Sequence, residues 1–166
     1  VKLDRLLSQY RQAAHDLPPI WESFLSKASL AAIREAAHAP APALGDEARL
    51  RVDYNQAYTA DEAVRAIQAI APFGIDCAEQ PVRADDWLGM ARVQRRVAVP
   101  LMAHEGCFSL TDATALIELG AIGVLGVNTE RPGGITQALR AIDYASQRGL
   151  GTVLHNQPLG IAAAAQ

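Results

Sequence analysis

Three short stretches decide the fold of this chain: L-R-V-D-Y-N-Q (50–56), I-D-C-A-E-Q-P (75–81) and V-P-L-M-A-H-E (99–105). Each is an apolar run with an acidic residue at or near its end, namely Asp53, Glu79 and Glu105. The spacing from Asp53 to Glu79 equals the spacing from Glu79 to Glu105. A carboxylate that recurs once per strand-plus-helix unit, where the strand ends, indicates one rim of a parallel barrel.

The three acids also predict a metal site. Oxygen ligands that converge on one point from three neighbouring strands suit a hard cation, and Mg²⁺ is the first candidate. The alternative is that the acids are merely solvated loop residues. Their common spacing, with Asn55 and Gln80 close to two of them, favours the metal site.

The composition is that of one globular domain and excludes some classes of function. Half of the 166 residues are hydrophobic and the formal net charge is −3, so no basic surface is available for nucleic acid. We find neither an apolar run of about 18 residues, as a membrane span requires, nor a signal-peptide pattern, and we therefore expect a cytoplasmic enzyme. The two cysteines, Cys77 and Cys107, are far apart in the sequence and indicate neither a zinc site nor a disulfide framework.

Strand and helix patterns alternate along the chain. Helices are expected after the Thr59–Glu62 capping box, over 85–95, after Ser109 and Asp112, and over a segment carrying Ile135 to Ala145. This alternation predicts βαβ units and a parallel sheet. The expected strands are 49–53, 75–79, 99–103, 122–127 and 152–155.

A doubly wound open sheet would give a similar alternation. A barrel is favoured because polar residues end every strand and no G-x-G-x-x-G follows the first one. The predicted fold is therefore α/β, an incomplete (β/α) TIM-type barrel of about six units, with 1–166 as one partial barrel domain. A closed eight-stranded barrel typically needs about 250 residues.

A sixth strand, which precedes these five in the sequence, would end at Lys27. It closes the stretch W-E-S-F-L-S-K (21–27) and precedes Asp53 by the same interval that separates Asp53 from Glu79, in phase with the three acids. One long helix running to Ala37 is the competing interpretation of this segment.

Five motifs resemble those of the enolase superfamily, and within it the mandelate racemase and muconate-lactonizing group. The likeness covers the chain from about Gly45 to its end. The motifs are R-V-D-Y-N-Q (51–56), C-A-E-Q-P (77–81), V-P-L-M-A-H-E (99–105), G-G-I (133–135) and V-L-H-N (153–156).

The resemblance implies a Mg²⁺ held by Asp53, Glu79 and Glu105. In many relatives the third ligand is the Asp of an Asp-Glu pair, and because His104 stands at that position here, Glu105 is expected to replace it. The implied reaction removes the proton α to the carboxylate of a small substrate, giving an enediolate. Racemases or epimerases, cycloisomerases and acid-sugar dehydratases share this step. The resemblance also implies a homo-oligomer in the full-length form.

The resemblance further implies catalytic roles at the strand ends. Lys27 is expected to act as one general base and His155 as another on the opposite face of the substrate. Asn128 is expected to hydrogen-bond the His155 ring, and Asn55 to contact substrate or a metal-bound water.

Departures from the family pattern leave a second function open. Relatives carry Lys-x-Lys where this chain has Leu25-Ser26-Lys27, and lactonizing enzymes and epimerases carry a lysine where it has Asn128. The amino-terminal capping domain and the first and eighth strands are expected to be absent. The alternative is a catalytically degenerate or truncated barrel that serves as a binding or structural unit.

Overall fold

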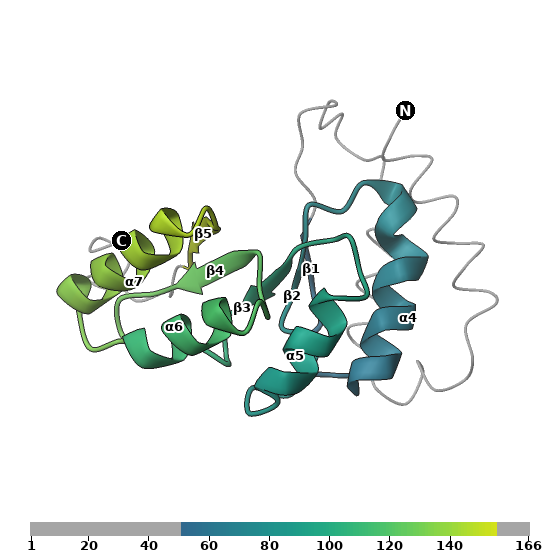
Figure 1. The fold of residues 1–166 in the computed structure, drawn as a ribbon, viewed down its shortest axis with the longest axis horizontal. Helices are drawn as coiled ribbons and strands as arrows, with labels where there is room; N and C mark the ends of the chain where they lie inside the picture. Colours follow the sequence, from purple (N-terminus) through teal and green to yellow (C-terminus); the bar gives the residue numbers. More distant parts are fainter. Residues whose placement is uncertain (1–50, 156–166) are drawn as a thin grey trace, which may run out of the picture. The chain divides into compact units, whose positions relative to one another are not determined.

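Residues 51–155 are described by a computed structural model of the protein, and strands alternate with helices throughout them (Figure 1). Within this range every helix is too short or too polar to cross a lipid bilayer. The strands are β1 (Arg51–Asp53), β2 (Cys77–Glu79), β3 (Leu101–Ala103), β4 (Val124–Val127) and β5 (Gly151–Leu154). The helices are α4 (Ala60–Ile70), the short 3₁₀ helix η1 (Ala71–Phe73), α5 (Trp87–Gln94), α6 (Leu110–Glu118) and α7 (Ile135–Gln147).

All five strands are parallel, and they lie in the sheet in their order along the chain. A doubly wound sheet would reverse this order at a switch point, so the sequential order favours the barrel type. Right-handed crossovers between neighbouring strands place the intervening helices on one face, and the sheet curls as half a barrel does (Figure 1). The sixth predicted strand, which ends at Lys27, lies outside the described residues, so the number of units stays a prediction.

The strand ends agree with the sequence better than the strand starts do. Four of the five strands end at the predicted residue, and β5 ends at Leu154, one residue early. β2, β3 and β4 each begin two residues later than predicted. In β3 the reason is Pro100, which has no N–H to donate to a neighbouring strand. The carboxyl edge, which carries the candidate site, is therefore the better predicted edge.

Pairing between the strands separates a core face from a site face. Ala78 pairs with Leu101 and belongs to the hydrophobic core, as does Leu125 of β4. Asp53 pairs with Glu79, and Glu79 pairs with Met102, so these three residues share the opposite face. The helices pack on the core face through buried apolar residues such as Ile67 of α4 and Leu116 of α6.

Side-chain caps fix the helix starts, as the sequence indicates. Ser109 precedes α6, and its Oγ accepts the backbone N–H of Asp112 at 3.1 Å, while Asp112 Oδ2 accepts the N–H of Phe108 at 2.9 Å. Asp86 caps α5 by accepting the N–H of Gly89 at 2.8 Å, so this helix begins at Trp87 rather than at residue 85. These bonds satisfy donors that have no partner inside the helix.

Glu62 provides a test of the α4 cap. Its Oε2 accepts the hydroxyl and the backbone N–H of Thr59, at 2.7 and 2.9 Å, and these bonds lower the pKa of Glu62 below its usual 4.5. A carboxyl with a lowered folded-state pKa stabilises the protein above its unfolded pKa and loses that contribution as the pH falls through the folded value. We expect Glu62→Gln to be less stable than the wild type near neutral pH, with the difference shrinking below pH 4.5.

Urea unfolding monitored by circular dichroism at several pH values measures this difference. The control is Asp143→Asn, on the exposed side of α7. This substitution should change the free energy of unfolding only slightly, and by the same amount at every pH. A Glu62→Gln difference that stays constant from neutral pH to below pH 4.5 would contradict the role assigned to the carboxylate.

Candidate metal centre

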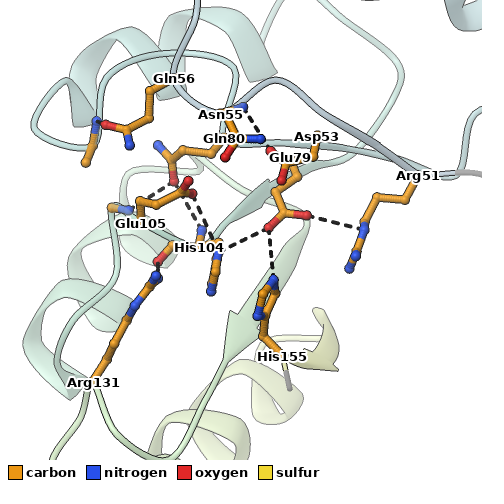
Figure 2. Close-up of polar contacts among 12 residues, drawn as sticks. Arg51, Asp53, Asn55, Gln56, Glu79, Gln80, His104, Glu105, Arg131 and His155 are labelled. Atoms are coloured by element: carbon orange, nitrogen blue, oxygen red, sulfur yellow. Dashed lines mark hydrogen bonds and ion pairs between the residues drawn. The ribbon is translucent and has the colours of Figure 1, made fainter. Parts of the chain in front are cut away.

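Glu79, the last residue of β2, is the centre of the site (Figure 2). Its side chain is 0% exposed, and neither carboxylate oxygen has a hydrogen-bond partner. Three basic groups surround it instead. Arg51 Nε lies 3.3 Å from Oε2, while His104 Nδ1 and His155 Nε2 lie 3.2 and 3.9 Å from Oε1.

The charge of Glu79 is maintained by these neighbours. Burial alone would raise its pKa, because desolvation disfavours the ionised carboxylate. The contact with His104 and the positive charge of Arg51 act in the opposite direction, and the net pKa is lowered. Glu79 is therefore a buried anion at neutral pH, available to bind a cation.

Two histidines that follow β3 and β5 form another part of the site. His104 directly follows β3 and His155 directly follows β5, and their rings are stacked with centroids 3.7 Å apart and planes inclined by 21°. Burial, followed by the charge of His104, lowers the pKa of His155 below its usual 6.5. A neutral imidazole has a lone pair that can accept a proton or bind a metal ion.

Within the described residues, one group of potential metal ligands comes together, formed by Glu79, His104 and His155. A donor atom from each lies within 4.8 Å of the donors of the other two. Asp53 and Glu105 are not members of this group, although both lie beside it in Figure 2. Of the three carboxylates that the sequence assigned to a metal, Glu79 is therefore central, and Asp53 and Glu105 lie at the periphery.

Glu105 lies in the turn after β3, next to His104. Its Oε2 is buried without a hydrogen-bond partner and lies 3.6 Å from His104 Nδ1. Like the two oxygens of Glu79, this atom lacks the partner that a buried polar atom requires. Such oxygens fit a divalent cation, which would satisfy them.

Asp53 is the exposed member of the acidic set. Burial of its carboxylate raises the pKa of Asp53, and the nearby charges of Glu79 and Glu105 raise it further, against the opposing bond from Asn55. In that bond the backbone N–H of Asn55 donates to Asp53 Oδ1 at 2.9 Å. A cation among the three carboxylates would relieve this repulsion of the Asp53 charge by Glu79 and Glu105.

Three residues other than glycine adopt left-handed backbone conformations at these strand ends. Asn55, Gln56 and Gln80 have φ values of 45°, 64° and 33°. Each such residue is strained by about 1–3 kcal/mol, and strain of this kind concentrates at functional sites. The side chain of Asn55 is exposed here, and its predicted contact with substrate stays a prediction.

Gln80 holds the turn that carries His104 and Glu105, a role that its sequence position did not reveal. Its buried Oε1 accepts the backbone N–H groups of His104 and Gly106, at 3.1 and 3.0 Å. Its Nε2 donates to the carbonyl of Val82 at 3.1 Å. The only signal in the sequence was its place at a strand end, because these partners are set by the packing of β2 against β3.

Asn128 has a different partner from the one predicted. Its Oδ1 accepts the backbone N–H of Arg131 at 3.0 Å, and Nδ1 of His155 has no hydrogen-bond partner. The predicted bond from Asn128 to the His155 ring is therefore wrong for this structure, because the turn after β4 occupies the acceptor. Arg131 in turn donates from Nη1 to the carbonyl of His104 at 2.6 Å and stacks on Phe108 at 4.9 Å.

Gly126 of β4 leaves room for the site. A Cβ at this position would lie 2.9 Å from the carbonyl oxygen of Ala103 and 3.5 Å from Cβ of His104. Even an alanine would therefore displace the end of β3. Lys27, the remaining predicted base, lies outside the described residues.

A parallel sheet in sequential order, with its polar side chains at the carboxyl ends of the strands, is the arrangement of a TIM-type barrel enzyme. The family model described as "Enolase C-terminal domain-like" matches residues 20–166. The chain belongs to this family, within the mandelate racemase and muconate-lactonizing group of the enolase superfamily.

Curated relatives of this chain are isomerases and related enzymes. A hydrophobic dipeptide epimerase from Enterococcus faecalis is 37% identical over 142 residues, which are 83% of this chain and 38% of the relative. Muconate cycloisomerase 1 from Pseudomonas putida is 36% identical over 107 residues, 64% of this chain and 28% of the relative. The chain thus spans less than two fifths of the length of either protein.

Solved structures show the same similarity. The Enterococcus faecalis dipeptide epimerase complexed with Mg and the dipeptide L-Leu-L-Tyr has a TM-score of 0.64 and 36% identity, over 76% of this chain and 34% of that one. The Cytophaga hutchinsonii dipeptide epimerase complexed with Mg and D-Ala-L-Val has a TM-score of 0.68 and 29% identity, over 82% of this chain and 36% of that one. The half-barrel is therefore a fold shared with Mg-containing complexes.

Gln80→Met tests the support of the turn after β3. The substitution keeps the side-chain volume but leaves two buried backbone N–H groups without an acceptor. We expect the free energy of unfolding to fall by about 2–6 kcal/mol, since each of the two groups costs about 1–3 kcal/mol. Chemical denaturation measures the change.

Gln147→Met, at the exposed end of α7, is the matched control and should be close to neutral. Equal stability losses in the two variants would show that Gln80 does not hold the turn.

Proposed function

We propose that this chain is the metal-binding part of an enzyme that removes the proton α to a carboxylate, in a racemase or epimerase reaction. The observation that carries the proposal is Glu79, a wholly buried carboxylate without hydrogen bonds at the carboxyl edge of a parallel sheet. A buried charge of this kind is costly unless a counter-charge compensates it. Membership of a family whose relatives are epimerases, racemases and cycloisomerases supports the reaction type.

The three carboxylates Asp53, Glu79 and Glu105 would hold Mg²⁺. When bound, this cation acts as a Lewis acid that stabilises the negative charge developing on the substrate carboxylate. Glu79 and Glu105 offer buried oxygens with no other partner, and Asp53 offers a carboxylate whose charge the other two disfavour. Arg51, beside Glu79, keeps the inner carboxylate ionised.

His155 is the described residue best placed to exchange a proton with substrate. It stands at the end of β5 on the site face, its ring is partly exposed, and Nδ1 has no competing hydrogen bond. Lys27 would act from the other face of the substrate, which is what inversion at a carbon centre requires. Asn128 shapes the turn after β4 and contributes to the site indirectly, through Arg131.

A dipeptide is the substrate class that the relatives favour. The most extended similarity among the relatives described above is to a hydrophobic dipeptide epimerase. Asn128 stands where lactonizing enzymes and epimerases alike are expected to carry a lysine, so this position does not distinguish the two reactions. The α-carbon next to the free carboxylate of the dipeptide would be the reacting centre.

One contact favours a second candidate, a binding or structural unit without turnover. His104 Nδ1 lies 3.2 Å from Glu79 and 3.6 Å from Glu105, so its imidazole stands where a cation between the two carboxylates would stand. Isothermal titration with Mg²⁺ distinguishes the candidates. The catalytic proposal requires a site that Glu79→Gln abolishes, and the non-catalytic unit would have none.

Deuterium exchange in D₂O tests the reaction itself. With Mg²⁺ present, we expect the α-proton of L-Leu-L-Tyr at its carboxyl-terminal residue to exchange, as measured by NMR, and chelation with EDTA to stop it. Glu79→Gln should reduce the exchange rate by at least about 100-fold, because the charge stabilisation is lost. His155→Asn should suppress exchange from one enantiomer more than from the other.

The control variant is Glu118→Gln, an exposed carboxylate on α6 that pairs with Arg148. It should leave the exchange rate unchanged. The catalytic proposal would be overturned if the Mg²⁺-loaded wild type reacted with none of three substrates: L-Leu-L-Tyr, N-succinyl amino acids and muconate.

A further inference from the structure

Glu79, His104 and His155 offer one carboxylate and two imidazoles to a single point, with donor atoms within 4.8 Å of one another. We propose that this cluster binds a borderline divalent transition cation, with Zn²⁺ as its representative, more tightly than Mg²⁺. Imidazole nitrogens suit zinc and its neighbours, whereas Mg²⁺ is bound almost entirely through oxygen. This selectivity does not depend on the proposed catalytic activity, although both use Glu79.

The distances suit a small cation with few ligands. In a tetrahedral zinc site with bonds of about 2.0–2.2 Å, neighbouring donor atoms lie about 3.4 Å apart. His104 Nδ1 lies 3.2 Å and His155 Nε2 lies 3.9 Å from Glu79 Oε1. Because the two rings are stacked, with centroids 3.7 Å apart and planes inclined by 21°, one imidazole would have to turn out of the stack for both lone pairs to reach one cation.

Buried atoms without partners point independently to a missing ligand. Both oxygens of Glu79, with its side chain 0% exposed, lack a hydrogen bond, as do Nε2 of His104 and Nδ1 of His155. Buried polar groups in folded proteins are almost always paired, so four unpaired atoms in one cluster require an explanation. A cation bound to the carboxylate and to the facing nitrogens, Nδ1 of His104 and Nε2 of His155, would satisfy the Glu79 oxygens, whereas the two unpaired nitrogens are those that do not face Glu79.

The surrounding structure positions His104 for this role. Its backbone N–H is held by Gln80 Oε1 and its carbonyl by Arg131, while Gly126 keeps the space beside its Cβ free. Ligands whose orientation is fixed before binding lose little entropy when the metal arrives.

Metal titrations of the whole chain test the proposal. Zn²⁺ and Mg²⁺ affinities are measured separately by competition with a chelating dye and by isothermal titration, and Co²⁺ serves as a coloured substitute for Zn²⁺. We expect one Zn²⁺ per chain, bound at least about 100-fold more tightly than Mg²⁺, as the donor set predicts. Co²⁺ should give the intense visible absorption of a site with four or five ligands rather than the weak colour of the hydrated ion.

Variants assign the ligands. His104→Asn and His155→Asn should each weaken Zn²⁺ binding by at least about 100-fold, because each removes a direct ligand. Neither should change Mg²⁺ affinity by more than about threefold, since Mg²⁺ relies on oxygen donors. The matched control is the double variant His15→Asn/His38→Asn, which removes the other two histidines of the chain and should leave Zn²⁺ binding unchanged.

Zn²⁺ binding that survives in both single variants would overturn the proposal, and so would losses of equal size for Zn²⁺ and Mg²⁺. If a variant fails to fold by circular dichroism, the Co²⁺ spectrum of the wild type still decides, because a spectrum like that of hydrated Co²⁺ contradicts imidazole ligation. Zn²⁺ binding without Mg²⁺-dependent exchange would refute the proposed function alone. Mg²⁺-dependent α-proton exchange without the expected Zn²⁺ site would refute only the proposed preference for Zn²⁺.

Discussion

The burial of the Glu79 carboxylate is the constraint on which the carboxyl edge of this sheet depends. An ionised carboxylate removed from water loses several kcal/mol of hydration, and the protein must return most of that through nearby positive charge. Arg51 of β1 supplies part of it, and the rings of His104 and His155 lie 3.2 and 3.9 Å from the carboxylate. Three segments therefore meet at the Glu79 carboxylate of β2: the start of β1, through Arg51, and the residues that follow β3 and β5.

This constraint would allow the two proposed metal chemistries to share one centre. Around Glu79, oxygen donors are available at Asp53 and Glu105 and nitrogen donors at His104 and His155. A carboxylate has two oxygens and can serve either set. Which cation occupies the centre then depends on the relative strength of the two donor sets and on the metals available to the protein.

The sequence predicted the backbone framework because that framework repeats. The equal spacing of acids at the ends of apolar runs was enough to place Asp53 and Glu79 at the ends of neighbouring parallel strands. Capping residues such as Thr59 and Ser109 marked helix starts because their bonds are local. These features are determined by residues a few positions apart, so they can be read from one sequence.

The contacts that organise the site are not local and were missed for that reason. Gln80 bonds to backbone groups 24 and 26 residues further along the chain, and Arg131 reaches back 27 residues to His104. His104 was recognised only as a departure from the family pattern. Its place beside Glu79 depends on the packing of β3 between β2 and β4, and the spacing of residues carries no information about side-chain direction.

The single amide of Gln80 also links the mobility of separate segments. Its oxygen is shared by the N–H groups of His104 and Gly106, and its nitrogen is bound to the carbonyl of Val82. Opening of the turn after β3 therefore breaks bonds to the end of β2 at the same moment, so the two segments fluctuate as one cooperative unit. The backbone of His104 is in this way held by Gln80, a side chain that is not itself a candidate metal ligand.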